Sequence, residues 1–469
     1  MQLIPTFSKD ARVDKSLGHS VKDGVAYAMM SGFGESYFSA FAIFLKATTP
    51  QIAILASLPP LLASSAQLLA VYIGQHTGAR KNVIIIGAVI QLCALALIAA
   101  MPVFFPAHGF VILIGLVVFY FAGSNLGAPL WGSLMGAIVP TGIRGRFFAT
   151  RTKMSSIASF SALILAGIIL QAFHDLSLTY YGFLSIFLLG VIARIVSVWH
   201  LSQQHDPPHL HALDGDVINL FNRRFFKGES KFLRFSLFHA CMQSAVAVSG
   251  PLVVIYLLRV LEYSYLELTI NTAASVVMQF LVLNRWGRLS DLFGNRIILR
   301  STGFIIPFVP LLWILSSDFF YLILVQAISG LIWSGFSLSA SNFVYDLTTQ
   351  QKRAGLMSVH AMVAAAAVFL GASIGGLLAV TLPSEIRIAG TEYSWQTAIY
   401  GVFFVSAMLR LIVAAAFLPR LQEVRDVKSM TYHGLLFRVT RFSPISGVIF
   451  DVVTRLTKKE ADEIADEND

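Results

Sequence analysis

The carboxylate of Glu35 lies inside a long apolar stretch, and no basic residue occurs between Lys22 and Lys46. If this stretch crosses a membrane, such a group costs about 2.5–3.5 kcal/mol and normally faces a bundle interior or a water-filled cavity. In a helix, Ser31 and Ser39 lie one turn to either side of it on the same face. We therefore predict that Glu35 carries a coupling proton or binds a cationic substrate group, and structural pairing is the alternative.

Three further apolar stretches carry polar side chains, and in two of them the spacing places these side chains on one face of a helix. Serine, asparagine and histidine in membrane helices also form hydrogen bonds to neighbouring helices, so substrate binding and helix packing are both open for each residue. The residues predicted to bind substrate, in addition to Ser31 and Ser39, are Asn125, His239, Gln243, Ser334 and Ser337.

The composition indicates an integral membrane protein. The 469 residues are 56% hydrophobic and 13% charged, whereas soluble domains are about 45–50% apolar and about 25% charged. The net charge of +9 comes from basic residues that lie between the apolar stretches rather than in one patch. The basic residues are therefore explained by a membrane, and we expect no nucleic-acid partner.

A membrane-spanning helix needs about 20 mainly apolar residues. The sequence contains twelve such stretches, at 21–45, 50–74, 83–104, 108–138, 154–174, 179–201, 232–258, 265–286, 297–316, 319–345, 354–380 and 395–418. We predict an all-α fold with a cytoplasmic segment at 1–20, six-helix bundles at 21–201 and 232–418, a central loop at 202–231 and a tail at 419–469.

The basic residues predict the orientation. With the N-terminus inside, all but three of the 34 basic residues lie in cytoplasmic segments or on helix ends that face them; the exceptions are Lys46, Arg259 and Arg387. Both termini are then cytoplasmic, in what we expect to be a bacterial inner membrane. The amphipathic stretch "VINLFNRRFFKG" and the tail are predicted to contact anionic lipids of the inner leaflet.

The two halves of the sequence show signs of an internal repeat. "VPTGIRGRFFATRTKMSSIASF" precedes the fifth stretch, and "LTTQQKRAGLMSVHAMVAAAAVF" precedes the eleventh. When the two are aligned, Arg144 matches Arg353 and Arg151 matches His360. Equivalent positions in two six-helix halves predict a parallel repeat.

The loop "GRLSDLFGNR", at 287–296, contains Gly287, Asp291, Gly294 and Arg296 in the pattern Gly-x-x-x-Asp-x-x-Gly-x-Arg. This loop resembles the signature of the major facilitator superfamily. The glycines permit a tight turn, and the carboxylate can accept hydrogen bonds from helix amides or from an arginine. In the equivalent loop of the first half, "VYIGQHTGARKNVI", Gln75 stands where the acid is expected.

The resemblance covers the twelve helices but not the tail. It implies a secondary transporter in which two bundles rock about a site lined by helices one, four, seven and ten, and we expect the chain to be monomeric. It assigns gating to the 287–296 loop, together with Arg144 and Arg353 at the equivalent helix starts. The well-known motifs of drug exporters, sugar porters and peptide carriers are absent from the sequence, so the resemblance identifies no subfamily.

We therefore predict a small-molecule transporter that is coupled to protons through Glu35, and not an enzyme. The sequence has no GxxxxGK[ST] phosphate loop for nucleotide hydrolysis. A carrier-like receptor that binds a ligand without turnover is the alternative class. Within transport, export of an apolar compound and import of a polar one are both open, and the substrate and its direction are not fixed.

Histidines in the central loop raise the question of a metal site. The residues His200, His205, His209 and His211 follow no standard zinc spacing, and Pro207 and Pro208 interrupt the segment. The two cysteines, Cys93 and Cys241, both lie in apolar stretches and fit a buried structural role. We predict no metal and no cofactor.

Overall fold

The computed structural model describes residues 10–77, 80–104, 109–140, 143–206, 228–348, 352–382, 385–388, 391–394 and 397–424. The predicted segments 1–20, 202–231 and 419–469 lie partly outside these residues. His209, His211 and the side chain of Arg353 lie outside them entirely.

The first half of the chain forms helices joined by turns and no strands among its described residues. Its helices are α1 (Ala11–Phe33), α2 (Phe38–Phe44), α3 (Thr49–Thr77), α4 (Arg80–Phe104), α5 (Gly109–Ile138), α6 (Arg144–Asp175) and α7 (Thr179–Ser202). The helices of the second half are α8 (Ser230–Ala247), α9 (Leu252–Ile255), α10 (Tyr265–Phe293), α11 (Asn295–Ile305), α12 (Val309–Leu315), α13 (Phe319–Leu347), α14 (Arg353–Thr381) and α15 (Ala398–Phe417).

Ten segments within the described residues are helical, long and apolar enough to cross a membrane. The two predicted spans that are not among the ten are 21–45 and 50–74. The structure covers the second of these with the single helix α3, whereas the helix of the first is interrupted.

The first predicted span differs from the structure in where it begins and in its continuity. Helix α1 begins at Ala11 because Asp10 caps it, with its carboxylate accepting hydrogen bonds from the backbone amides of Arg12 and Val13 at 2.8 and 3.4 Å. The prediction of an unbroken helix over 21–45 is wrong, because a 3-10 turn at Glu35–Tyr37 separates α1 from α2.

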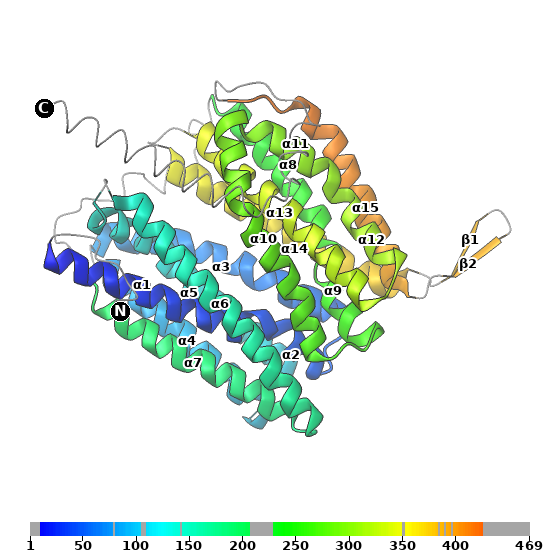
Figure 1. Cartoon of the computed structure of the whole chain (residues 1–469), viewed down its shortest axis with the longest axis horizontal. Helices are drawn as coiled ribbons and strands as arrows, with labels where there is room; N and C mark the ends of the chain where they lie inside the picture. Colours follow the sequence, from blue (N-terminus) through cyan, green and yellow to red (C-terminus); the bar gives the residue numbers. More distant parts are fainter. Residues whose placement is uncertain are drawn as a thin grey trace, which may run out of the picture.

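The predicted all-helical class is confirmed, and one short β-hairpin is the exception within it. Strands β1 (Glu385–Ile388) and β2 (Thr391–Ser394) pair antiparallel between α14 and α15, with Glu385 opposite Ser394. Figure 1 shows this hairpin extending away from the helices.

The helices form two groups, which Figure 1 shows in blue to green and in green to orange. Helices α1 to α7 pack mainly against one another, as do α8 to α15, and the main contacts between the groups are α3 with α14 and α6 with α10. We call the face where α1 begins and α3 ends the terminal face. The face where α2 ends and α3 begins is the opposite face.

The two groups are joined at the opposite face. The hydroxyl of Tyr37 donates to the carbonyl of Leu163 at 2.8 Å and lies 2.8 Å from Oγ1 of Thr269, across the boundary between the groups. The guanidinium of Arg259 donates to the carbonyl of Ala47, also across this boundary.

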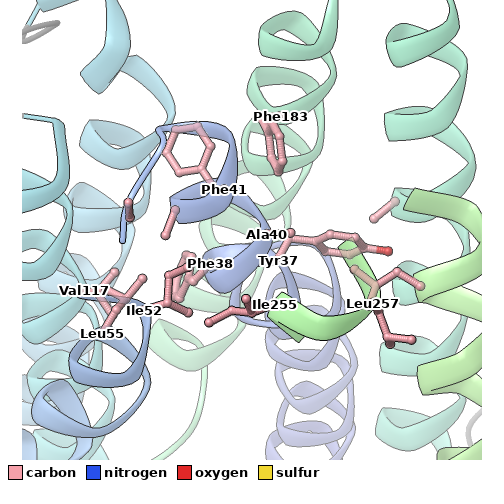
Figure 2. Packing of buried hydrophobic residues seen from close by; sticks show 14 of the residues in the cluster. Tyr37, Phe38, Ala40, Phe41, Ile52, Leu55, Val117, Phe183, Ile255 and Leu257 are labelled. Carbon is pink, nitrogen blue, oxygen red and sulfur yellow. The ribbon is translucent and has the colours of Figure 1, made fainter. Parts of the chain in front are cut away.

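An apolar cluster surrounds these polar contacts. Figure 2 shows Phe38, Ile52 and Leu55 from the first group beside Ile255 and Leu257 from the second, and all five belong to one buried core. Apolar packing of this kind excludes water. The structure therefore has its two helix groups closed against each other at the opposite face.

Candidate functional site

Glu35 lies at the interruption between α1 and α2, where it is half-buried. Its carboxylate accepts a hydrogen bond from Oγ of Ser31 at 2.5 Å. Within the described ranges, no basic side chain forms a salt bridge with Glu35. Ser39 is half-buried on α2, one turn beyond the interruption. A carboxylate that is held by a hydroxyl, without a cation, can exist with or without a proton.

Another carboxylate, Asp23 on α1, belongs to a charged network inside the first helix group. Its side chain is 4% exposed. The carboxylate accepts from Oγ of Ser197 at 2.7 Å, and Nη1 of Arg194 donates to the same serine at 2.9 Å. Nη2 of Arg151, on α6, lies 3.8 Å from the other carboxylate oxygen. Asp23 therefore interacts with two arginines from different helices.

This charged network borders a cavity of about 250 Å³ among α1, α4, α5, α6 and α7. The lining residues on α5 include Ser124, whose Oγ lies 3.0 Å from the hydroxyl of Tyr27 on α1. The residues that line it are Asp23, Tyr27, Ile84, Gly123, Ser124, Gly127, Ala128, Trp131, Arg151, Arg194 and Leu201.

Asn125 on α5 forms a hydrogen bond to a side chain of a neighbouring helix. Its Oδ1 accepts from Nε2 of Gln67 on α3 at 2.7 Å, and its Nδ2 donates to the carbonyl of Phe121 at 2.9 Å. Gln67 was not predicted from the sequence. A polar side chain in a span that also contains Pro59 and Pro60 was a signal that could have drawn attention to it.

The histidine on α8 lies in an aromatic setting in the second helix group. His239 stacks beside Phe336, with ring centroids 6.4 Å apart, and its ring lies 4.7 Å from that of His360 on α14. Nδ1 of His360 lies 3.0 Å from Oγ of Ser236. Nδ1 of His239 is buried without a hydrogen-bond partner among the described residues. The structure thus brings His239 together with His360, which the sequence had indicated only through the repeat.

The remaining predicted binding residues do not gather at one point. Ser334 is buried and donates to the carbonyl of Leu331 in its own helix at 2.8 Å. Ser337, on the same helix, is exposed, and Gln243 on α8 is half-buried. The hydrogen bond of Ser334 therefore lies within its own helix and does not reach a neighbouring one.

The turn between α10 and α11 is held by neighbours of the predicted gating residues. Gly294 has a φ of 82°, a backbone conformation that favours glycine. Asp291 is exposed, whereas Asn295 is fully buried. The Asn295 amide accepts from Oγ of Ser290 at 2.6 Å and donates to Asp346 on α13 at 2.9 Å.

The other members of the predicted gating set lie at helix ends on the terminal face. Gly287 has open space around it. The backbone amide of Arg296 donates to the carboxylate of Glu423 at 2.8 Å. Nη2 of Arg144 donates to the carbonyl of Gly136 at 3.1 Å, near the end of α5.

The aligned residues of the two halves occupy corresponding places. Helix α6 packs against α1, and α14 packs against α8. Arg151 on α6 reaches Asp23 on α1, while His360 on α14 reaches Ser236 on α8. This agrees with the alignment of Arg151 with His360.

Two of the four histidines considered for a metal site are described, His200 near the end of α7 and His205 after it, and they make separate contacts. Nδ1 of His200 lies 2.9 Å from Nδ1 of His19, whereas the backbone amide of His205 donates to Oγ of Ser16 at 3.1 Å. Among the residues that the structure describes, no three histidine, cysteine or acidic side chains form a group able to hold a metal ion.

Comparisons with known proteins give the same picture of the fold. The sequence profile of the Major Facilitator Superfamily matches residues 25–285 and 235–446. The MFS-type transporter ppz2 of Metarhizium majus (strain ARSEF 297) is 36% identical over 93 residues, which is 20% of this chain and 16% of that protein. The match therefore spans less than a fifth of that relative.

Solved transporter structures resemble most of the chain at low sequence identity. The nucleoside transporter NupG superposes with a TM-score of 0.64 at 16% identity, covering 87% of this chain and 100% of that one. A D-xylose-proton symporter superposes with a TM-score of 0.67 at 13% identity, covering 89% and 99%. At this identity the similarity concerns the fold alone. Because the family profile covers most of the sequence, the chain belongs to the Major Facilitator Superfamily of membrane transporters.

Proposed function

We propose that this chain is a secondary transporter with twelve membrane-spanning segments in two six-helix bundles, and that it moves a small molecule by alternating access. In this proposal the first two spans are α1 with α2, and α3. The terminal face is the cytoplasmic one, since the basic residues gather there in the sequence. Closure of the helix groups at the opposite face supports a state that is open toward the cytoplasm.

We further propose that Glu35 couples transport to protons. The observation that carries this proposal is its position at the break between α1 and α2, with Ser31 as its hydrogen-bond partner and no salt bridge among the described residues. Tyr37, two residues along the chain, contacts Thr269 across the boundary between the groups. Protonation of Glu35 would therefore change the charge next to the contact between Tyr37 and Thr269 at the opposite face.

The substrate pathway is proposed to lie between the two helix groups. Its polar residues are the predicted set, Ser31, Ser39, Asn125, His239, Gln243, Ser334 and Ser337, to which the structure adds Gln67 and His360. The turn at 287–296 and the helix starts at Arg144 and Arg353 are proposed to control the opening at the terminal face.

The coupling role is tested with Glu35→Gln in proteoliposomes. A thermal-shift screen of small metabolites identifies a transported compound, and its uptake is then measured with and without an imposed proton gradient. We expect Glu35→Gln to abolish accumulation driven by the gradient and to retain exchange of labelled for unlabelled substrate. Exchange does not require net proton movement, so its retention separates a coupling defect from unfolding.

Glu262→Gln is the matched control, because Glu262 is an exposed glutamate outside the membrane-spanning helices. This variant is expected to accumulate substrate as the parent protein does. Accumulation by Glu35→Gln that follows the proton gradient like the parent protein would show that Glu35 is not the coupling group. If substrate is bound but never crosses the membrane, the chain is a receptor rather than a transporter.

A further inference from the structure

The cavity in the first helix group holds more positive than negative charge. Arg151 and Arg194 both line it, and Asp23 is the only acidic residue among the lining residues that the structure describes. The contact from Arg151 to Asp23 is 3.8 Å, longer than the about 2.7–2.9 Å of a strong charge-assisted hydrogen bond. One carboxylate therefore compensates two guanidinium groups, and one positive charge is left over.

Two buried donors at this cavity have no acceptor. Nε of Arg194 and Nε1 of Trp131 are both buried without a hydrogen-bond partner within the described parts of the chain. A buried donor without a partner costs about 1–3 kcal/mol. These donors are buried in the cavity wall, whereas an anionic ligand in the cavity would compensate the extra positive charge.

The cavity holds its arginines in fixed orientations. The guanidinium of Arg151 lies 4.2 Å from the ring centre of Trp131, and that of Arg194 lies 5.0 Å from the ring centre of Tyr27. Gly24 makes the first position possible, since a Cβ there would lie 2.8 Å from the Arg151 guanidinium. Prearranged donors of this kind favour a planar, two-oxygen ligand group.

Size and access restrict the ligand further. The cavity volume of about 250 Å³ is below the about 300–1,000 Å³ of pockets for drug-sized ligands. The side chain of Arg151 is 20% exposed, so part of it is open to a small ligand. Ile84 and Leu201 supply an apolar wall.

We propose that this cavity binds a small organic monoanion whose carboxylate is held by Arg194 and Arg151, with the organic part against the apolar wall. The inference goes beyond the proposed transport function, because it adds a ligand site inside the first helix group, apart from the proposed pathway between the groups. It differs from the polar pathway residues predicted above, none of which lines this cavity.

Equilibrium binding to the purified full-length chain tests the inference without requiring transport. Thermal shift and calorimetry compare benzoate and propionate with their uncharged analogues benzamide and propionamide. The carboxylates are expected to bind and the amides to bind at least tenfold more weakly, because the amides lack the charge that Arg194 and Arg151 recognise. Equal binding of acids and amides would overturn the inference.

Two variants, one that removes a positive charge from the cavity and one that removes its negative charge, test the inference further. Arg194→Gln is expected to weaken benzoate binding by roughly tenfold or more, and Asp23→Asn is expected to tighten it by removing the competing carboxylate. Arg234→Gln is the matched control, since Arg234 is exposed on α8. If Arg194→Gln does not fold, Asp23→Asn alone decides, and unchanged or weaker binding in it contradicts the inference.

The two proposals fail in different ways. Carboxylate binding together with no flux of any screened compound in proteoliposomes would leave the cavity assignment intact and reject transport. Proton-coupled flux of another compound, with no carboxylate binding, would reject the cavity assignment and leave the transport function intact.

Discussion

Among single residues, Asn295 shows how the turn at 287–296 is held together. The signature predicted that the carboxylate of Asp291 makes the polar contacts of this turn, yet Asp291 is exposed. Asn295 is buried and bridges Ser290 to Asp346 on α13. The side chain that joins α10, α11 and α13 is therefore four residues beyond the predicted acid.

Asn295→Ala is expected to destabilise the protein by about 1–3 kcal/mol, because Ser290 and Asp346 each lose a buried hydrogen-bond partner. Asp291→Asn is the control and is expected to leave stability unchanged, since its side chain is exposed. Thermal unfolding in detergent measures both. A larger loss in Asp291→Asn than in Asn295→Ala would show that the acid holds the turn.

At the scale of helices, α14 packs closely against α8 through small residues. Gly371 and Gly375 form a GxxxG pattern. A Cβ on Gly371 would collide with the backbone carbonyl of Ser244 on α8, and a Cβ on Gly375 with that of Val248, which directly follows α8. Small residues at this spacing allow membrane helices to approach closely. The pattern is readable in the sequence, but the helix that it contacts is not.

Gly375→Ala is expected to force α14 away from the α8 segment and to destabilise the protein by about 1–3 kcal/mol. Gly132→Ala is the matched control on α5, where a Cβ would meet nothing within 4 Å. The midpoint of thermal unfolding is compared for the two variants. A fall in Gly132→Ala as large as that in Gly375→Ala would mean that the effect comes from glycine itself and not from the close approach.

At the scale of the whole molecule, contacts at the opposite face determine which side is closed. Gly376 on α14 lies against α3, and a Cβ there would lie 2.8 Å from Cβ of Ala53 and 3.1 Å from Cα of Pro50. Together with the Tyr37–Thr269 contact, this leaves no room for a larger side chain. The packing of the opposite face is thus sensitive to the volume of the side chain at position 376.

Gly376→Trp is expected to hold the opposite face open, because an indole cannot fit between α14 and α3. The measurement is labelling of Leu257→Cys by a membrane-impermeant maleimide, in a background with Cys93 and Cys241 replaced by serine. Leu257 is 1% exposed in the closed arrangement, so labelling should rise severalfold. Gly115→Trp, on α5 with open space around its glycine, should not change it; equal labelling in both variants would contradict the mechanism.

The sequence by itself determined the membrane class and most helix positions, because stretches of about 20 apolar residues are not stable in water. It also indicated the family, because the 287–296 signature consists of residues that are contiguous in the chain. It also identified Glu35, since a lone carboxylate among apolar residues is conspicuous without any knowledge of its neighbours. Each of these features depends on residues that are close together in the chain.

Only the tertiary structure decided which distant residues meet. It interrupted the first span at Glu35, joined Tyr37 to Thr269, and brought Asp23 together with Arg151 and Arg194. These contacts join different helices, and one sequence carries no record of which helix faces pack together. Helix packing alone therefore placed two arginines and one carboxylate around the same cavity.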